Sequence, residues 1–566
     1  MDYKNEYELW LQNVTEAERA ELEALDEGAR KESFYTSLEF GTAGMRGILR
    51  LGTNGMNDYT VGRATVGLAK YIVSCKKEQA GVAISYDSRN KSAEFARLTA
   101  CILAHFNIKS YLYDELRPVP LLSFGVRHYK AFAGVMITAS HNPKEYNGYK
   151  VYGEDGAQLS LEPAAAMLEL INKESYFDIP KADFDTACKN GIIKVVGKDL
   201  DDAYFDAVLP LIDKNVIAAC ADLKIVYTPI HGSGCKPVCR AFELMGLKGV
   251  HLLQSQEKPD GNFSTVKSPN PENIEALTLA IEKAREINAD LVIGTDPDCD
   301  RMGVAVRNKQ GQYVALTGNQ TGCIMLESLL ATKKANGSLP DNGAVIKTIV
   351  TSEMVRAIAS AYGAETVEVL TGFKFIGEKI KQYEETGSNT YLFGFEESYG
   401  YLLGTHARDK DGVIASMLLA QTACRLAAEG KTLLDGLEDI YNKYGCYLEK
   451  TLSFTLSGIE GMQKIKDTMI RLAKENITAV GDSKVIAKRN YNTSEREQDG
   501  KITPILLPKS NVLYYELEND GWACVRPSGT EPKLKVYLGV KGCCIDSAKE
   551  RLAATEKALV EIVGLQ

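Results

Sequence analysis

The chain reads Ala289-Asp-Leu-Val-Ile-Gly-Thr-Asp-Pro-Asp-Cys-Asp-Arg301 where a short apolar run meets three aspartates. The apolar run predicts a buried strand, which places Asp296, Asp298 and Asp300 in the loop at its carboxyl end, where ligands bind in open α/β sheets. Like charges at every second position repel one another unless a cation compensates them, and hard oxygen ligands favour Mg²⁺, Ca²⁺ or Mn²⁺. The loop therefore predicts a divalent-metal site, with a water-exposed acidic turn as the alternative.

Apolar runs of strand length alternate with amphipathic segments of helix length along most of the chain. The expected strands are residues 81–86, 108–113, 132–138, 223–227, 250–253, 291–293, 344–350, 366–370 and 391–393. Such alternation predicts an α/β protein with three similar α/β domains and mixed, largely parallel sheets. The last part of the chain differs, because strands at 512–517, 523–525 and 534–538 precede a long helix at 547–563. We therefore expect a C-terminal α+β domain.

The chain has 566 residues, of which 45% are hydrophobic and 25% charged, an ordinary globular composition. At roughly 100–200 residues per domain, this length suffices for several domains that each bury a core. The predicted boundaries are 1–205 for an α/β domain that contains the segment 138–143, 206–318 for one with the aspartate loop, 319–448 for one with the segment 394–398, and 449–566 for the α+β domain with the segment 526–533.

The charge and the cysteine pattern exclude several classes of protein. The formal net charge is -9 and no long basic block is present, so nucleic acid is not an expected partner. The N-terminus lacks a basic start followed by an apolar run, and no stretch is apolar enough to span a bilayer, so we expect no membrane partner and a cytoplasmic location. Cys235 and Cys239 have a spacing compatible with metal ligands, but no second pair accompanies them. The 13 cysteines are expected to be reduced and mostly buried.

A second loop with potentially reactive side chains, Thr138-Ala-Ser-His-Asn-Pro143, follows the predicted strand at 132–138. It should expose Ser140 at a strand end, a suitable place for a nucleophile that a base, a metal or prior activation would have to assist. No Gly-x-Ser-x-Gly elbow surrounds this serine, so an acyl-transfer hydrolase fits poorly. Lys150 lies close in sequence and could transfer protons if its pKa were lowered. The alternatives are a plain turn and an ordinary surface lysine.

Two further loops contain groups that suit a phosphorylated sugar. Gly394-Phe-Glu-Glu-Ser398 offers Glu396 and Ser398 to sugar hydroxyls, or alternatively to a helix cap. Arg526-Pro-Ser-Gly-Thr-Glu-Pro-Lys533, with Lys535 just beyond it, has the chemistry of a phosphate cradle, a plain β-turn being the alternative. Together with the metal and serine loops, they suggest a substrate that already carries one phosphate while its other end gains or loses another.

The whole chain resembles the α-D-phosphohexomutase family, and within it the long branch that includes phosphoglucomutases and phosphopentomutases. The resemblance rests on five motifs in family order, which are Phe40-Gly-Thr-Ala-Gly-Met-Arg-Gly47, Thr138–Pro143, Gly294–Arg301, Gly394–Ser398 and Arg526–Thr530. It implies four domains around a central cleft and a transferable phosphate carried by Ser140. It also implies Mg²⁺ bound by the three aspartates and by a phosphate oxygen on that serine.

The same resemblance implies roles for individual residues. Arg46 and Arg301 would lie near the reacting phosphate, while Lys150 and His141 would serve proton transfer. The implied substrate-binding residues are Arg301, Thr371, Gly372, Lys374, Glu396, Ser398, Lys410, Arg526, Ser528, Gly529, Thr530 and Lys535.

The reaction that this family performs would interconvert glucose 1-phosphate and glucose 6-phosphate. Phosphorylated Ser140 would give its phosphoryl group to the sugar, forming glucose 1,6-bisphosphate, and would recover the other phosphate after the intermediate had turned round. Glucose 1,6-bisphosphate would also act as an activator, and the expected partners are small sugar phosphates. The alternatives are a phosphopentomutase acting on ribose or deoxyribose phosphates, a metal-dependent sugar phosphatase, and a non-catalytic sugar-phosphate sensor. The oligomeric state is left open.

Overall fold

The structure is a computed structural model that describes residues 2–41, 44–456, 458–528 and 533–565. The chain forms two compact units. The first unit contains Met1–Thr317, Ile376–Gly387 and Ser398–Gly430, and the second contains Gly318–Phe375, Ser388–Glu397 and Lys431–Gln566. The predicted boundaries of the four domains stay a prediction.

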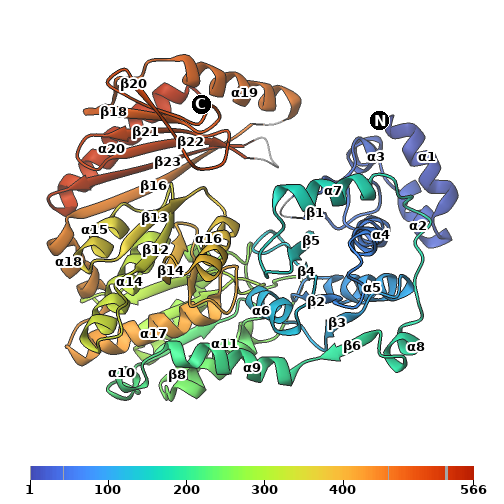
Figure 1. The fold of residues 1–566 in the computed structure, drawn as a ribbon, viewed down its shortest axis with the longest axis horizontal. Helices are drawn as coiled ribbons and strands as arrows, with labels where there is room; N and C mark the ends of the chain where they lie inside the picture. Colours follow the sequence, from blue (N-terminus) through green and yellow to red (C-terminus); the bar gives the residue numbers. More distant parts are fainter. Residues whose placement is uncertain (1, 42–43, 457, 529–532, 566) are drawn as a thin grey trace. The chain divides into compact units, whose positions relative to one another are not determined.

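The first unit contains a six-stranded sheet in the order β1-β5-β4-β2-β3-β6 (Figure 1). Its strands are β1 (Met45–Ile48), β2 (Val82–Tyr86), β3 (Ser110–Tyr113), β4 (Ala133–Ile137), β5 (Tyr146–Gly153) and β6 (Ile193–Val196). Strands β4, β2, β3 and β6 are parallel, whereas β5 runs antiparallel to both β4 and β1. The predicted strands at 81–86, 108–113 and 132–138 are thus confirmed.

Helices cover this sheet and form its two apolar cores. They are α4 (Asp58–Ser74), α5 (Ser92–His105), α6 (Val119–Tyr129), α7 (Leu161–Ile171), α8 (Phe184–Lys189) and α9 (Lys198–Val208), followed by the 3₁₀ turn η1 (Leu209–Leu211). Because β2 and β4 are covered on both faces, nearly all their residues are buried, which explains why they are apolar runs without alternation. Asn57 caps α4 by accepting hydrogen bonds from Tyr59 and Thr60.

Three helices precede this sheet and were not predicted from the sequence. They are α1 (Tyr3–Asn13), α2 (Glu16–Glu23) and α3 (Glu27–Phe34). Trp10 is fully buried at their centre and packs edge-on against the rings of Phe34, Tyr59 and Phe177. These aromatic contacts attach the N-terminal helices to the first sheet's helix α4.

A five-stranded sheet in the order β11-β10-β9-β7-β8 follows in the first unit. Its strands are β7 (Ile225–Thr228), β8 (Val250–Leu252), β9 (Leu291–Thr295), β10 (Met302–Arg307) and β11 (Tyr313–Leu316). Strands β8, β7 and β9 are parallel and the other two are antiparallel. The accompanying helices are α10 (Lys214–Ala218), α11 (Cys235–Met245), α12 (Gln254–Glu257), η2 (Ile274–Leu277) and α13 (Thr278–Ile287). Helix α17 (Gly412–Ala428), much later in the chain, packs against α11, and strand β15 (Gly400–Leu403) precedes it.

The second unit contains three parallel strands in the order β13-β12-β14. They are β12 (Gly343–Thr348), β13 (Glu365–Val369) and β14 (Thr390–Glu396), with helices α14 (Gly318–Ala335), α15 (Met354–Ala361) and α18 (Leu433–Tyr444). Helix α16 (Phe373–Thr386) starts in the second unit and ends in the first. Each of the three helix-covered sheets has a parallel core, which confirms the predicted fold class.

The C-terminal part is an antiparallel sheet with helices, as predicted. Its strands follow the order β16-β23-β22-β21-β18-β19-β20, with β17 beside β18. They are β16 (Cys446–Thr455), β17 (Ala479–Val480), β18 (Ser483–Asn490), β19 (Glu495–Gln498), β20 (Lys501–Pro504), β21 (Leu513–Leu517), β22 (Trp522–Pro527) and β23 (Lys533–Gly542). The helices are α19 (Gly458–Lys474) and α20 (Ile545–Val563), the second of which was predicted.

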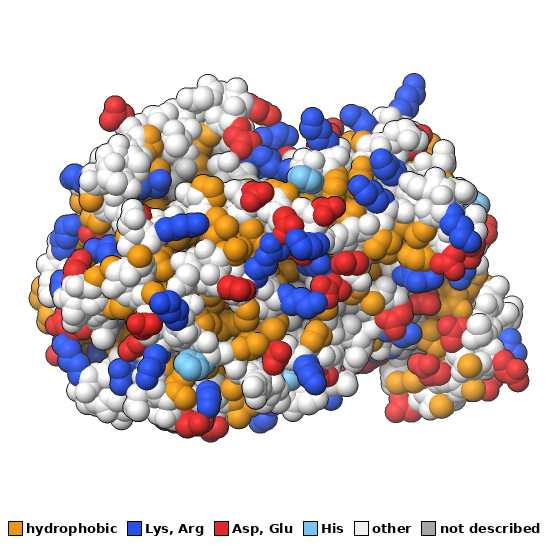
Figure 2. Space-filling model, turned by 90° about the horizontal axis from the view of Figure 1, so that it is seen from below, with side chains coloured by type: hydrophobic (Ala, Val, Ile, Leu, Met, Phe, Trp, Pro, Cys, Tyr) orange, Lys and Arg blue, Asp and Glu red, His pale blue; other side chains and the backbone are white. Residues whose placement is uncertain are grey.

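Acidic and basic side chains are interspersed on the face shown in Figure 2. Among the described residues, no helix has both the length and the apolar character needed to cross a bilayer. All 13 cysteines carry free thiols; six are buried, whereas Cys543 and Cys544 are exposed.

Candidate active site

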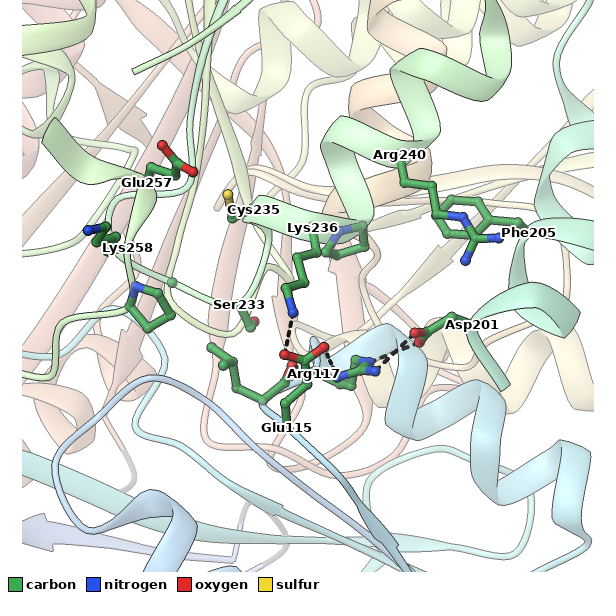
Figure 3. Close-up of a pocket in the computed structure, with 14 residues that line it drawn as sticks. Glu115, Arg117, Asp201, Phe205, Ser233, Cys235, Lys236, Arg240, Glu257 and Lys258 are labelled. Carbon is green, nitrogen blue, oxygen red and sulfur yellow. Dashed lines mark hydrogen bonds and ion pairs between the residues drawn. The ribbon is translucent and has the colours of Figure 1, made fainter. Parts of the chain in front are cut away.

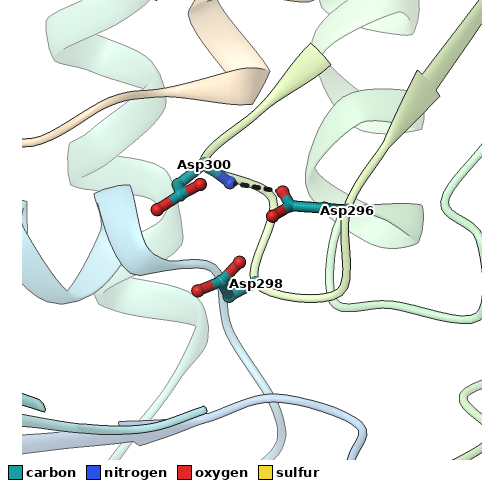
Figure 4. Close-up of side chains that lie close together, drawn as sticks. All are labelled: Asp296, Asp298 and Asp300. Carbon is teal, nitrogen blue, oxygen red and sulfur yellow. Dashed lines mark hydrogen bonds between the residues drawn. The ribbon is translucent and has the colours of Figure 1, made fainter. Parts of the chain in front are cut away.

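The three aspartates lie in a tight loop between β9 and β10. Asp296 and Asp298 are 0% exposed and Asp300 is 1% exposed, so this is not a water-exposed acidic turn. One carboxylate oxygen from each lies within 4.8 Å of the others (Figure 4). The backbone N–H groups of Asp300 and Arg301 donate to Asp296 Oδ1 at 3.1 and 3.0 Å, which closes the loop. The structure therefore gathers the three acids that the sequence singled out.

Two lysines compensate part of this buried charge. Lys150 Nζ lies 2.9 Å from Asp298 Oδ2, and Lys410 Nζ lies 2.9 Å from Asp300 Oδ2. Burial, together with the neighbouring carboxylates of Asp298 and Asp300, raises the pKa of Asp296 well above its usual value. Burial also acts to raise the pKa of Asp298, but the Lys150 ammonium, the hydrogen bond with Asp296 and the Lys410 ammonium together hold that pKa below the usual range.

The donor set fits a hard divalent cation. Oδ1 of Asp298 and Oδ1 of Asp300 are buried and make no hydrogen bond to any described residue. Buried carboxylate oxygens without a donor are costly unless a cation binds them, and oxygen ligands are those that Mg²⁺ and Ca²⁺ accept. The three aspartates could therefore hold such an ion.

The serine loop follows directly from strand β4. Ser140 has a left-handed backbone with φ of 52°, and its N–H donates to Thr138 Oγ1 at 2.8 Å. Ser140 Oγ donates to Asp296 Oδ2 at 2.9 Å, so the hydroxyl adjoins the aspartate cluster. The side chain was expected to be exposed, but Ser140 is only 6% exposed because the metal loop packs over it.

Three predicted residues surround this serine. His141 Nδ1 lies 3.3 Å from Ser140 Oγ; burial, assisted by Arg301 and Arg46, holds the pKa of His141 well below its usual value. The imidazole is therefore neutral near pH 7. Arg46, on β1, donates to Asn142 Oδ1 at 3.2 Å. Arg301 Nε lies 3.8 Å from Asp300 Oδ1.

The predicted sugar-binding residues divide between the two units. Glu396, at the end of β14, is 8% exposed, and its Oε1 accepts the N–H of Gly372 at 2.9 Å. That glycine has φ of +118°, a conformation that L side chains rarely adopt. Thr371 and Lys374 flank it and are half-buried. Ser398 belongs to the first unit.

The predicted phosphate loop lies between β22 and β23. Arg526 and Lys535 are direct register partners on these strands, and the N–H of Ser528 donates to the carbonyl of Lys533 at 2.7 Å. Gly529 and Thr530, also predicted to bind phosphate, lie outside the described residues. Burial and Glu397 raise the pKa of Tyr537 while Arg526 lowers it. The charges of Glu397 and Arg526, one from each loop, therefore both act on this tyrosine.

Sequence reasoning missed several residues that shape the site. Arg89 and Asp87 follow strand β2 and contact the Ser140 loop, and Glu272 forms an ion pair with Arg301. The sequence did contain a signal for Asp87 and Arg89, because these two charged residues directly follow an apolar strand. Strands β2 and β4 are parallel neighbours, so their carboxyl ends meet at one edge of the sheet, and residues after β2 are expected near the Ser140 loop after β4.

A cavity of about 330 Å³ is lined by residues that include Glu115, Arg117, Asp201 and Ser233 (Figure 3). It is lined by ion pairs such as Arg117 with Asp201. Ser233 in its wall donates through both N–H and Oγ to the carbonyl of Pro297 at 2.8 Å, and Val119 N–H donates to the carbonyl of Asp298 at 2.9 Å. These contacts hold the backbone of the metal loop from two sides.

Comparison with known proteins places the chain in a family. Four phosphoglucomutase/phosphomannomutase domain models match, namely α/β/α domain I at 37–177, domain II at 202–311, domain III at 317–444 and the C-terminal domain at 494–556. A phosphoglucomutase of Staphylococcus epidermidis is 39% identical over 516 residues, covering 90% of this chain and 92% of the relative. One of Staphylococcus aureus is 38% identical over 556 residues, covering 97% and 98%.

Solved structures share the fold at lower identity. The parafusin phosphoglucomutase of Paramecium has a TM-score of 0.69 at 16% identity, with 94% of this chain and 96% of that chain covered. A phosphoglucomutase/phosphomannomutase family protein of Burkholderia thailandensis has a TM-score of 0.61 at 18% identity, with 92% and 97% covered. The chain belongs to the phosphoglucomutase/phosphomannomutase family of phosphohexomutase enzymes.

Proposed function

We propose that this enzyme interconverts glucose 1-phosphate and glucose 6-phosphate through a phosphoserine at Ser140. The observation that carries the proposal is the 2.9 Å hydrogen bond from Ser140 Oγ to Asp296, within a buried cluster of three carboxylates. A phosphoserine adds a charge of about -1.5 to -2, which beside three aspartates requires a cation. Relatives named phosphoglucomutase along nearly the whole chain support glucose phosphate as the substrate.

Asp296, Asp298 and Asp300 would hold Mg²⁺ together with a phosphate oxygen on Ser140. The bound ion would withdraw charge from the transferring phosphoryl group. A hexosamine-phosphate mutase of the same fold was solved with magnesium and a sugar phosphate, at 13% identity and a TM-score of 0.50.

The residues around Ser140 are assigned roles in proton transfer and charge stabilisation. His141, neutral at pH 7 and 3.3 Å from Ser140 Oγ, would accept or return the hydroxyl proton. Lys150, on strand β5, contacts Asp298 of the metal loop and would exchange a proton with the sugar hydroxyl. Arg46 and Arg301 would stabilise the equatorial oxygens of the reacting phosphate.

The remaining predicted residues would bind the parts of the substrate that do not react. Glu396, with Thr371, Gly372, Lys374 and Ser398, would bind sugar hydroxyls, and Lys410 would face the substrate from the metal-loop side. The non-reacting phosphate would be bound by Arg526, Ser528, Gly529, Thr530 and Lys535. Because the bisphosphate intermediate must turn round, this second group has to accept a phosphate from either end of the sugar. Free glucose 1,6-bisphosphate would recharge a serine that had lost its phosphate.

The deciding experiment measures glucose 6-phosphate formed from glucose 1-phosphate, with and without catalytic glucose 1,6-bisphosphate. Stimulation by the bisphosphate supports the mutase. Release of inorganic phosphate instead would identify a sugar phosphatase, and binding without turnover would identify a sensor. Faster turnover of ribose 1-phosphate would identify a phosphopentomutase. A cytoplasmic location and the four domain boundaries remain predictions.

Replacing Arg526 with Ala should weaken the binding of the non-reacting phosphate. Loss of a charge-assisted hydrogen bond worth roughly 1.5–3 kcal/mol lowers kcat/KM by about ten- to a hundredfold. We expect KM for glucose 1-phosphate to rise and kcat to fall, because binding energy from the remote phosphate aligns the reacting end. Steady-state kinetics check this, while Ser140 should still be phosphorylated by the bisphosphate.

The matched control for that prediction is Arg496→Ala in the same antiparallel sheet. Arg496 on β19 is ion-paired with Glu516 on β21, across the intervening strand β18, and β19 lies three strands from β22, which carries Arg526. Its replacement should leave both kinetic constants near their wild-type values. Normal kinetics in Arg526→Ala would show that the loop after β22 is only a structural turn.

A further inference from the structure

The loop that carries Ser140 wraps around one buried guanidinium, that of Arg89. Nη2 of Arg89 donates to the carbonyls of Ser140 and Asn142, both at 2.5 Å. Nη1 donates to the carbonyls of Pro143 and Tyr146 at 2.9 and 3.0 Å. The arginine side chain is 0% exposed. Four carbonyls from one short segment therefore converge on a single cation, which fixes the path of the backbone.

A carboxylate from the same turn, that of Asp87, holds the loop through a second route. Asp87 Oδ2 lies 3.4 Å from Arg89 Nε and accepts a hydrogen bond from Thr138 Oγ1 at 2.6 Å. Thr138 Oγ1 in turn accepts the N–H of Ser140 at 2.8 Å. Asp87 is itself fixed by Ser92 Oγ, which donates to Oδ1 at 2.8 Å. The Asp87–Arg89 pair thus holds both the N–H and the carbonyl of Ser140.

This support matters because Ser140 has a conformation that is unfavourable for a residue with a side chain. A left-handed backbone is strained for a non-glycine residue, and such strain persists only where the surroundings over-determine it. Here the strained backbone directs Ser140 Oγ toward Asp296. Without the two routes of support, the loop would relax and the hydroxyl would move away from the aspartate cluster.

We propose that Asp87 and Arg89 are positioning residues, which hold Ser140 against the aspartate cluster during both phosphoryl transfers. The proposal rests on the proposed mutase function. Neither residue needs to touch the substrate, so their loss should lower kcat and leave the binding of the sugar phosphate intact. A misplacement of about 1 Å can cost on the order of 10²-fold in rate.

The test uses two variants that disturb one route each. Arg89→Lys keeps the positive charge, but a compact ammonium cannot span four carbonyls as a planar guanidinium does. Thr138→Val keeps the side-chain shape and removes the hydroxyl that connects Asp87 to the Ser140 N–H. That hydroxyl also donates to Asp298 Oδ2 at 3.2 Å, so the Mg²⁺ dependence of the variant's activity is measured as well and should match that of wild type. Both should lower kcat on the order of 10²-fold, with KM within about threefold of wild type. Phosphorylation of Ser140 by glucose 1,6-bisphosphate, followed by intact mass in a single turnover, should slow in parallel.

Arg117→Lys is the matched control. Arg117 is also a buried arginine of the first unit, 6% exposed, and its ion pairs with Asp114, Glu115 and Asp201 lie outside the Ser140 loop (Figure 3). It should lower Tm as much as Arg89→Lys does and keep kcat. If Arg89→Lys does not fold, Thr138→Val decides the question alone.

The outcomes distinguish a failure of the proposed mutase function from a failure of the positioning role. Wild-type protein that failed to convert glucose 1-phosphate would overturn the proposed function, and the positioning role with it. An active wild type with unchanged kcat in Thr138→Val and in folded Arg89→Lys would overturn the positioning role alone. An equal loss of kcat in Arg117→Lys would do the same, because it would reveal general destabilisation.

Discussion

Ser140→Ala should abolish mutase turnover, with a loss on the order of 10⁴-fold or more, because the residue that accepts and donates the phosphoryl group is removed. The fold should survive, since the substitution removes one hydroxyl whose partners are Asp296 and His141. Intact-mass analysis should show one added phosphate on a fraction of the wild-type protein and none on the variant. Tm should differ little between the two.

Ser110→Ala provides the control for that prediction. Ser110 is a fully buried serine on β3 of the same sheet, and its Oγ has no hydrogen-bond partner among the described residues. Its replacement should leave turnover and phosphorylation unchanged. Retained turnover in Ser140→Ala, or phosphate remaining on that variant, would contradict the assignment of the nucleophile.

Local sequence was sufficient for the parts of the fold whose strands are buried on both faces. The strand predicted at 291–293 is Leu291–Thr295 in the structure, and the helix predicted at 547–563 is Ile545–Val563. The strand carries its signal in its own residues, because helices on both sides of a parallel sheet require continuous apolar runs. The helix belongs to the antiparallel C-terminal part, and its signal is the apolar face that buries Ala548, Leu559 and Val563.

Segments stabilised by distant partners carried a weaker signal. Strand β16 (Cys446–Thr455) pairs over its full length with β23, close to a hundred residues later in the chain, and its second half is largely exposed. Its polar residues give no apolar run, and its strand conformation follows from the partner strand. The helices around Trp10 are a similar case, since their shared core includes Tyr59 and Phe177.

The candidate site was predictable where chemistry is concentrated in one loop. Three aspartates at alternate positions, or a serine directly after an apolar strand, can be recognised as candidate site residues from the local sequence alone. The support of such loops was not predictable, because Arg89 binds carbonyls, which every residue possesses. The burial of Ser140 was also missed, since it depends on a metal loop that lies far away in the sequence.

The aspartate cluster is where the metal hypothesis can be tested most directly. Asp298 is suited to this because its Oδ2 is paired with Lys150 while its Oδ1 has no hydrogen-bond partner among the described residues. Asparagine has nearly the same shape, so the side chain should still fit its buried position. What changes is the charge, and a neutral amide cannot replace an anionic ligand of Mg²⁺.

Asp298→Asn should therefore weaken Mg²⁺ binding by at least about ten- to a hundredfold and lower kcat on the order of 10³-fold. Titration of activity against Mg²⁺ measures both effects, and binding can be followed separately by the Mg²⁺-induced rise in Tm. Asp201→Asn is the control, because that carboxylate is paired with Arg117 outside the cluster and should keep the wild-type Mg²⁺ dependence. If Asp298→Asn kept the wild-type Mg²⁺ dependence as well, the three acids would serve only to anchor Lys150 and Lys410, and the phosphoryl transfer would need another source of positive charge.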